Sequence, residues 1–182
     1  MLFRSEQRAR AKAVNFGIIY GSSAFGLSQQ LGIAAGEAQE QINAYFARYE
    51  GVRRFLDETT AQAKEDGFVR TLMGRRRYLP DLASRNRVLR QAAERMATNT
   101  VIQGTAADLI KKAMVDVDRA LSETGIEATM IMQVHDELVF ETTQDALSEL
   151  SELVRARMEQ VAVLSVPLTV DIGSGASWRD AH

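Results

Sequence analysis

Residues 128–142, ATMIMQVHDELVFET, hold two strand-like runs with almost no loop between them. The runs ATMIMQV and ELVFET are rich in apolar and strand-forming residues, and their short connection predicts a tight antiparallel hairpin. The residues at or beside its turn are His135, Asp136 and Glu137. An antiparallel sheet covered by helices is an α+β arrangement, so this stretch sets the expected fold class.

The chain after this hairpin is expected to add a helix and a strand. Asp145 suits the first turn of a helix, because carboxylates are favoured at helix N-termini. Apolar residues then share one helical face: Leu147, Leu150, Val154, Met158 and Val161. The run VPLTVDIG, residues 166–173, is predicted to form a final strand.

The chain before the hairpin is predicted to be mostly helical, because its apolar residues recur at helical spacing. FVRTLMGRRRYLPD, residues 68–81, reads as a short hairpin with a proline stop, after Gly67 ends the preceding helix. A long helix follows, with a bend or break near Gln103 and Gly104, since glycine lowers helix propensity by roughly 1 kcal/mol. The predicted helices are residues 5–20, 24–32, 36–49, 52–64 and 86–121.

Composition excludes several classes of protein. The chain has no cysteine, so disulfides, thiolate metal sites and a cysteine nucleophile are excluded. No apolar run approaches the about 18 residues of a membrane helix, and we expect a cytosolic protein. Residues 1–100 carry 16 Lys and Arg against 10 Asp and Glu, whereas residues 101–182 carry 6 against 14. We therefore expect a basic half that can face phosphate and an acidic half that can hold cations.

Four residues at a spacing of four form a stripe of two cations and two aromatic rings on the first helix: Arg8, Lys12, Phe16 and Tyr20. Such a stripe can hold a nucleoside triphosphate, because cations bind phosphates and planar rings stack on sugar and base. The same spacing also fits an ordinary amphipathic helix with solvated cations and buried rings.

A second line of side chains rich in hydrogen-bond donors, Arg95, Asn99 and Gln103, also recurs every four residues. The DNA minor groove offers acceptors at every base pair, so such donors can grip a duplex without reading its sequence. An ordinary polar helix face is the alternative. Further arginines add phosphate-binding capacity nearby: Arg75, Arg76, Arg77, Arg85, Arg87 and Arg90.

The hairpin places Asp136 and Glu137 at the end of an apolar strand pair. Carboxylates held on rigid strands suit Mg²⁺, which needs few protein ligands when substrate phosphates complete its shell. A polar turn is the alternative. One carboxylate pair does not make a two-metal site, which needs a further carboxylate from elsewhere.

Together, these three sets of residues resemble DNA polymerase family A. RARAKAVNFGIIYG, residues 8–21, is similar to the motif B of the family, and MQVHDELVFE, residues 132–141, is similar to its motif C. GRRRYLPD, AERMATNTVIQGTAAD, VDIGSGASW and WRDAH also match the wording of the family. The resemblance covers essentially the whole chain and implies helical fingers over residues 1–84 and part of an antiparallel-sheet palm over residues 85–182.

The resemblance also implies residue roles. Arg8 and Lys12 would bind the triphosphate, and Lys12 would give a proton to the leaving pyrophosphate. Phe16 would lie against the sugar, and Tyr20 near the templating base. Metal ligation would fall to Asp136, with Glu137 in support and His135 beside the primer terminus. The expected DNA contacts are Arg90, Arg95, Asn99 and Gln103.

One departure from the family concerns its motif A, usually DYSQIELR, which these residues do not contain. That motif supplies a second catalytic aspartate and the glutamate that excludes ribonucleotides. We therefore expect a fragment, weak or inactive alone, whose two-ion Mg²⁺ site is completed by a missing N-terminal polymerase portion. The absent strand is expected to leave an unpaired sheet edge or an exposed apolar surface.

The implied partners are primer-template DNA and deoxynucleoside triphosphates, with no membrane, and the implied location is the bacterial cytoplasm at the nucleoid. A non-catalytic DNA-binding fragment and a phage-type single-subunit RNA polymerase are the alternatives. The continuation of the hairpin through Glu137, Leu138 and Val139 fits the DNA enzyme better. An HD-type phosphohydrolase is excluded, because the only other histidine is His182.

Overall fold

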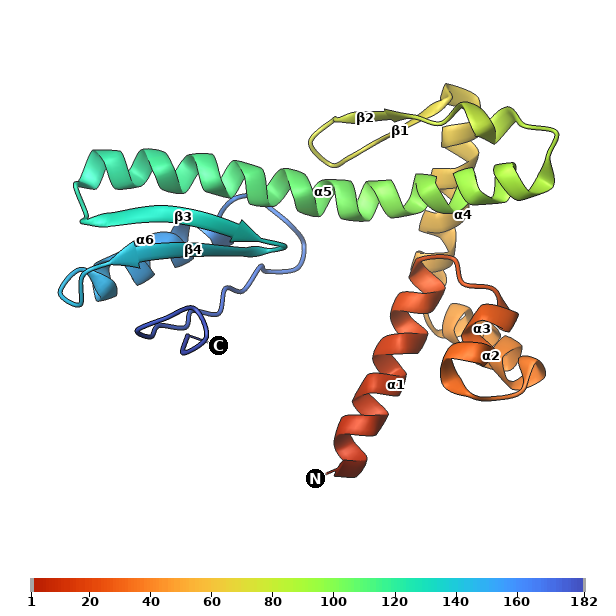
Figure 1. Ribbon diagram of the computed structural model, residues 1–182. Helices are drawn as coiled ribbons and strands as arrows, with labels where there is room; N and C mark the ends of the chain where they lie inside the picture. Colours follow the sequence, from red (N-terminus) through yellow and green to blue (C-terminus); the bar gives the residue numbers. More distant parts are fainter. Residues whose placement is uncertain (1, 182) are drawn as a thin grey trace. The chain divides into compact units, whose positions relative to one another are not determined.

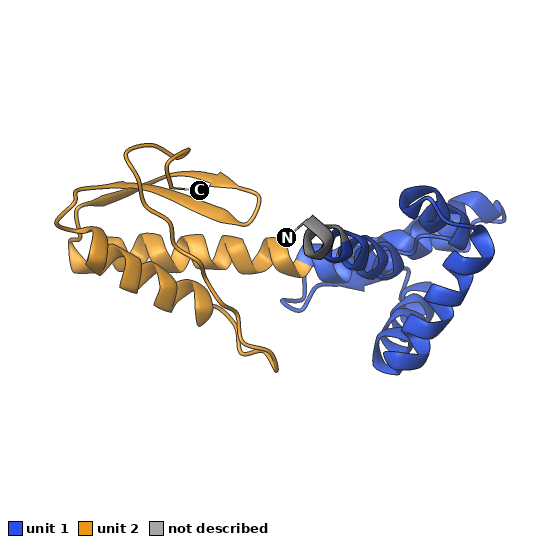
Figure 2. Cartoon of the chain, turned by 90° about the horizontal axis from the view of Figure 1, so that it is seen from below, with its two compact units in different colours: residues 1–104 blue, residues 105–182 orange. Residues whose placement is uncertain are grey.

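The computed structural model describes residues 2–181, with side chains from Gln7 onward, and divides the chain into two compact units (Figure 2). Unit 1 ends at Gly104 and unit 2 begins at Thr105. Helices with two small antiparallel sheets confirm the predicted α+β class. The predicted boundary after residue 84 separates two subdomains of the family, whereas the boundary after Gly104 separates two compact units. The predicted boundary therefore stays a prediction.

Unit 1 begins with four helices, α1 (Leu2–Ile19), α2 (Ala24–Leu31), α3 (Ala35–Arg48) and α4 (Glu50–Asp66) (Figure 1). Helix α2 begins after Ser23, whose Oγ accepts a hydrogen bond from the Gly26 N–H at 3.1 Å. Helix α4 ends at Gly67, which adopts a φ of 74°. A left-handed residue of this kind closes the last turn, so the predicted stop is confirmed.

A short hairpin follows, made of β1 (Phe68–Arg70) and β2 (Arg76–Tyr78), and it leads into a 3-10 turn at Pro80–Ala83. The hairpin is antiparallel, as predicted, and pairs Val69 with Arg77 at its centre. One buried cluster joins α4, this hairpin, the 3-10 turn and the next helix, and it is the core that holds these elements together. Its members are Ala63, Val69, Leu79, Leu82, Ala93 and Ala97.

Helix α5 (Arg87–Thr124) runs without interruption through Gly104, so a break there is wrong, and the predicted bend stays a prediction. A Cβ built on Gly104 would lie 2.8 Å from the Cγ2 of Thr71 in the hairpin loop. The glycine therefore permits close packing of the hairpin loop on α5. Hydrogen bonds along the helix offset its cost in helix propensity, which is about 1 kcal/mol.

Unit 2 contains the hairpin β3 (Ala128–Val134) and β4 (Glu137–Thr142), followed by α6 (Leu147–Glu159). The strands are antiparallel, as predicted, and a bulge leaves Ile131 without a partner. Val117 and Leu121 of α5 meet Leu150 and Val154 of α6 in one buried cluster. Met130 and Phe140 of the hairpin pack against this cluster, so the two helices cover one face of the sheet.

The predicted final strand over residues 166–173 is wrong, because no ladder forms there. A strand needs a partner, and within the described residues β3 and β4 pair only with each other. The Val170 N–H instead donates to the Glu159 Oε1 of α6 at 3.0 Å. The sheet keeps exposed apolar residues, with Ile131 at 50% and Met132 at 43% exposure, as expected for an uncovered surface. Across residues 2–181, no helix has the length and apolarity to cross a membrane.

Candidate functional site

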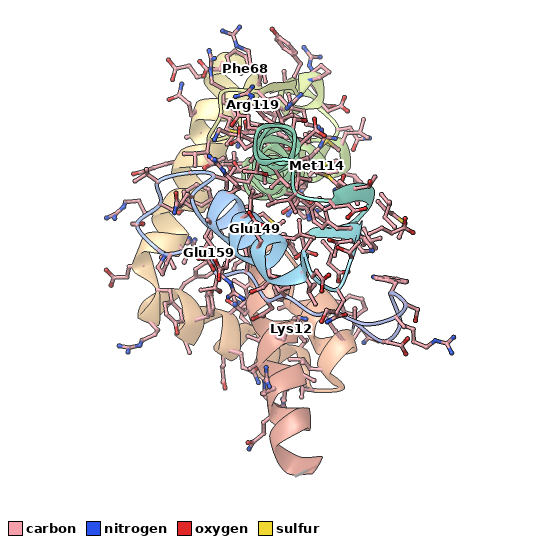
Figure 3. The ribbon with its side chains drawn as sticks, turned by 90° about the vertical axis from the view of Figure 1, so that its left-hand side faces the viewer. Lys12, Phe68, Met114, Arg119, Glu149 and Glu159 are labelled. Carbon is pink, nitrogen blue, oxygen red and sulfur yellow. The ribbon has the colours of Figure 1, made fainter. Side chains whose placement is uncertain are left out.

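Helix α1 carries the predicted stripe. The Lys12 Nζ lies 5.8 Å from the centre of the Phe16 ring, and the Phe16 and Tyr20 rings stack at 5.9 Å with an interplanar angle of 23°. Figure 3 labels Lys12 on this helix. Phe16 is 43% exposed, so its ring is not a buried core residue. One cation and two rings therefore form a continuous surface on which a planar ligand can stack.

Part of this stripe lines a groove of about 710 Å³ between α1 and α3. Lys12 and Phe16 contribute to its α1 wall, and Tyr45 of α3 and Tyr49, which directly follows α3, form the opposite wall. Arg8 and Tyr20 do not line it. The structure thus places the middle of the stripe, but not its two ends, against this groove.

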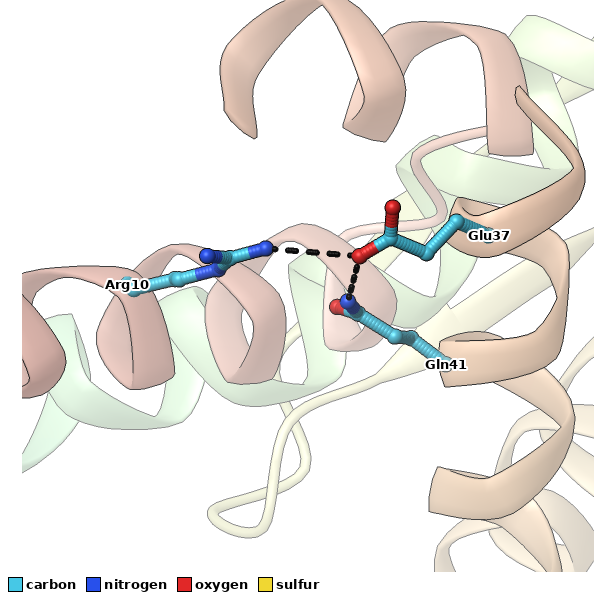
Figure 4. A network of polar contacts seen from close by, with 3 residues as sticks. All are labelled: Arg10, Glu37 and Gln41. Atoms are coloured by element: carbon cyan, nitrogen blue, oxygen red, sulfur yellow. Dashed lines mark hydrogen bonds and ion pairs between the residues drawn. The ribbon is translucent and has the colours of Figure 1, made fainter. Parts of the chain in front are cut away.

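Hydrogen bonds between α1 and α3 brace the groove, and sequence reasoning missed all of them. The Glu37 Oε1 of α3 accepts from the Arg10 Nη2 of α1 at 3.5 Å, and the Gln41 Nε2 of the same α3 helix also donates to it at 3.4 Å (Figure 4). The Tyr45 hydroxyl donates to the Asn15 Oδ1 at 2.7 Å. Burial, with a smaller contribution from the neighbouring Tyr49, raises the pKa of Tyr45 above its usual 10.0. This phenol therefore stays a neutral donor near neutral pH.

The end of the stripe meets the start of the polar line on α5. Gly21 follows Tyr20 with a φ of 75°, and a Cβ there would lie 2.8 Å from the Arg95 Cγ. Only glycine combines this backbone angle with so close an approach. Two of the predicted sets of residues, one on α1 and one on α5, are therefore brought together within unit 1.

The residues of the polar line on α5 differ in solvent exposure and in hydrogen bonding. Arg95 and Gln103 are exposed, whereas Asn99 is half-buried. The Asn99 Oδ1 is buried and has no hydrogen-bond partner among the described residues, and an orphaned buried polar atom marks a place for a ligand or water. Arg90 donates through its Nη1 to the Ser84 carbonyl at 3.1 Å, so its guanidinium is already partly engaged.

The tip of the β3–β4 hairpin holds the third predicted set, within unit 2. His135 and Asp136 form its two-residue turn, and Glu137 begins β4. His135 has a φ of 55°, which is uncommon for a residue other than glycine. The Gln133 Nε2 donates to the His135 carbonyl at 2.8 Å and braces the turn. The exposed Asp136 carboxylate is thus presented by a short, fixed turn.

Metal binding by this tip would need ligands from beyond it. Among the described side chains, which begin at Gln7, there is no group of three or more His, Asp or Glu residues that could hold an ion. The oxygen donors of Asp136 and Glu137 suit a hard cation such as Mg²⁺, but they supply only part of its shell.

The chain matches known protein sequences over nearly all its length. The model of DNA polymerase family A matches residues 2–180. DNA polymerase I of Pseudomonas aeruginosa is 53% identical over 177 residues, which cover 97% of this chain and 19% of that protein. DNA polymerase I of Bacillus subtilis is 50% identical over 177 residues, 97% of this chain and 20% of that protein. The chain thus spans about a fifth of the length of these relatives.

A solved structure of a polymerase domain has a similar fold. The POL domain of Pol1 from M. smegmatis, in a complex with DNA primer-template and dNTP, is similar with a TM-score of 0.94 at 49% sequence identity. The match covers 97% of this chain and 31% of that chain.

Proposed function

The chain belongs to DNA polymerase family A, and from this premise we propose that it provides part of the machinery for template-directed DNA synthesis. In this reaction the 3′-hydroxyl oxygen of a primer attacks the α-phosphorus of a deoxynucleoside triphosphate, a new P–O bond forms, and pyrophosphate leaves. The observation that carries the proposal is the similarity, at a TM-score of 0.94, to a polymerase domain that holds primer-template and dNTP.

The stripe on α1 is proposed to bind the incoming nucleotide. Arg8 and Lys12 are cations on one helical face, and cations neutralise the charge of a triphosphate. Lys12 is also the proposed proton donor to pyrophosphate, because an ammonium can protonate a leaving oxygen. Phe16 and Tyr20, whose rings stack on each other, are proposed to contact the sugar and the templating base.

Asp136 is proposed to hold Mg²⁺, with Glu137 as a supporting carboxylate and His135 beside the primer terminus. A bound Mg²⁺ would stabilise negative charge on the phosphates and lower the pKa of the attacking hydroxyl. The Asp136 side chain contributes a fixed oxygen donor on a two-residue turn, where the chain has little freedom to move it. The second carboxylate of a two-ion site is proposed to come from polymerase sequence outside these residues.

The polar line on α5 is proposed to hold the duplex, through Arg95, Asn99, Gln103 and Arg90. Arg95 and Gln103 expose donors, and donors in the minor groove find acceptors at every base pair. The contact between Gly21 and Arg95 supports a common site, because it joins this line to the nucleotide stripe. With DNA as its substrate, the protein is proposed to act in the bacterial cytoplasm at the nucleoid.

A chimera tests this function. The matching 177 residues of the Pseudomonas aeruginosa polymerase would be replaced by this chain, and extension of a labelled primer would be measured with Mg²⁺ and deoxynucleotides. We expect extension by the chimera and its loss in Asp136→Ala. Glu141→Ala is the matched control, because it removes an exposed carboxylate from β4 of the same hairpin.

Two results would contradict the proposal. A folded chimera that binds primer-template but extends nothing would leave a DNA-binding role without catalysis. Equal extension by the chimera and by its Asp136→Ala variant would remove Asp136 from the metal site.

A further inference from the structure

The β1–β2 hairpin carries four arginines and no acidic residue between Phe68 and Tyr78. Three of them lie in the strands, and the register divides these three between two faces, because alternate residues of a strand point to opposite sides. Arg77 pairs with the buried Val69, and its Nη1 donates to the Thr100 Oγ1 of α5 at 3.1 Å. Arg77 therefore helps to attach the hairpin to α5.

The other face of the hairpin combines two cations with two aromatic rings. Phe68 pairs with Tyr78, and Arg70 pairs with Arg76. The guanidinium carbons of Arg70 and Arg76 lie 4.9 Å and 5.0 Å from the centre of the Phe68 ring, which Figure 3 labels. The Tyr78 ring meets the same ring edge-on at 5.6 Å. We call these four residues the outer face.

The outer face holds a charge arrangement that costs folding stability. Arg70 and Arg76 are directly opposite across the strands, and like charges in that position are destabilising. Neither guanidinium forms an ion pair with a carboxylate among the side chains that the structure describes, from Gln7 onward. Stacking on Phe68 offsets part of the repulsion, and a polyanion bound at this face would remove the rest.

We propose that the outer face binds single-stranded DNA, as a contact separate from the nucleotide stripe and the carboxylate tip. Two guanidiniums would hold successive phosphates, and the Tyr78 ring, which is 67% exposed, would stack on an unpaired base. A duplex fits less well, because its bases are already stacked and offer no free face to a ring. The inference rests on the proposed function only in taking DNA as the polyanion.

Binding of a labelled single strand of about 20 nucleotides to the full chain tests this inference, measured by fluorescence anisotropy over a series of salt concentrations. The sample contains no primer, nucleotide or Mg²⁺. In Arg70→Gln/Arg76→Gln, the slope of log affinity against log salt is expected to fall by about 1.4, because each lost phosphate contact removes about 0.7. Tyr78→Leu is expected to weaken binding about tenfold without changing the slope.

Two further variants serve as controls. Arg48→Gln/Arg54→Gln removes the same charge from exposed positions of α3 and α4, and it is expected to leave the slope unchanged. Arg70→Lys/Arg76→Lys keeps both charges, so it is expected to keep the slope. Thermal unfolding of every variant checks that the hairpin folds, and the same substitutions in the chimera repeat the test in a complete polymerase.

The inference is overturned if Arg70→Gln/Arg76→Gln and Arg48→Gln/Arg54→Gln lose affinity equally, since net charge alone would then explain binding. An equal loss on duplex and on single strand would overturn the assignment to single strands. Failure of primer extension by the chimera would count against the proposed function only, because this binding measurement needs no synthesis.

Discussion

The β3–β4 and β1–β2 hairpins are both antiparallel and carry charges of opposite sign. The β3–β4 hairpin has six residue pairs, a two-residue turn and carboxylates at its tip. The β1–β2 hairpin has three pairs, a longer loop over residues 71–75 and arginines on its outer face. A two-residue turn has no spare residue, whereas the loop over residues 71–75, although hydrogen bonds between Thr71 and Arg75 close it, is long enough to accept a change in length.

This difference matches what each charge is proposed to bind. A metal ligand in a catalytic site must be held within about 0.5 Å, because a misplacement of 1 Å can cost a factor of about 100 in rate. Contacts to phosphates act through charge and tolerate movement. The carboxylates of the acidic hairpin must therefore be held in fixed positions, whereas the arginines of the basic hairpin can bind phosphates without being held so closely.

Lengthening each turn by one glycine tests this difference between the hairpins, and it gives the largest expected effect. An insertion between His135 and Asp136 should lower the rate of primer extension by the chimera about 100-fold or more, because the carboxylate moves. An insertion after Gly74 should change single-strand affinity less than about threefold. Steady-state extension and anisotropy measure the two outcomes. Similar losses at both turns would show that the basic hairpin is as exacting as the acidic one.

Backbone angle offers a second test at the two turns. His135 has a φ of 55° and Gly74 a φ of 83°, both unfavourable for a β-branched residue. His135→Val and Gly74→Val should each cost about 1–2 kcal/mol, which lowers Tm by about 2–8 °C. His135→Gly is the control and should not lower Tm. Thermal unfolding by circular dichroism decides, and an unchanged Tm in both valine variants would contradict the left-handed turns.

The packing of the basic hairpin on α5 is tested by Gly104→Ala. The new methyl would lie 2.8 Å from the Thr71 Cγ2, and overpacking costs about 1–3 kcal/mol, partly offset by the higher helix propensity of alanine. We expect a net loss of about 1 kcal/mol. Thr71→Ser removes the opposing methyl and keeps the Oγ that accepts from the Arg75 N–H, so the double variant should recover. Denaturant unfolding of the wild type, the two single variants and the double variant measures the free energy of unfolding of each. Additive losses of this free energy in the double variant would rule out the contact.

The smallest expected effect is a change in the pH dependence of stability at Tyr45, which lies outside both hairpins. Its pKa is raised above 10.0 in the folded state, so the folded chain keeps this proton after the unfolded chain has lost it. Its stabilisation is therefore fully present below pH 10 and is lost as the pH rises through the folded pKa. The stability difference between the wild type and Tyr45→Phe should narrow above pH 10, as measured by urea unfolding. A constant difference would contradict the raised pKa.

Features that depend on neighbouring residues could be predicted from the sequence. The stripe from Arg8 to Tyr20 lies on one helix, so its spacing predicts that its members share a face. The β3–β4 hairpin follows from two strand-like runs and a connection too short for anything else. Their roles in binding remain predictions, because spacing does not identify a ligand.

Features that depend on distant residues could not be predicted. The Arg10–Glu37 and Asn15–Tyr45 contacts join residues 27 and 30 positions apart, and only the packing of α1 on α3 creates them. The low helix propensity of Gly104 is the same whether it breaks the helix or makes room for the Thr71 side chain. Its role therefore became visible only with the position of the hairpin loop. Residues 166–173 have strand propensity, but a ladder also requires a partner strand.

The bulge at Ile131 has a consequence for how β3 tolerates changes in length. Met130 pairs with Phe140 and Met132 with Val139, so Ile131 is a surplus residue between two consecutive rungs. Deleting Thr129, with the outer pairs kept in register, would move Met130 to the opposite face of the sheet. Deleting Ile131 would instead preserve all six pairs and remove only the extra local twist. Deletion at this one position can therefore change the direction of the carboxylate tip while every cross-strand pair stays the same.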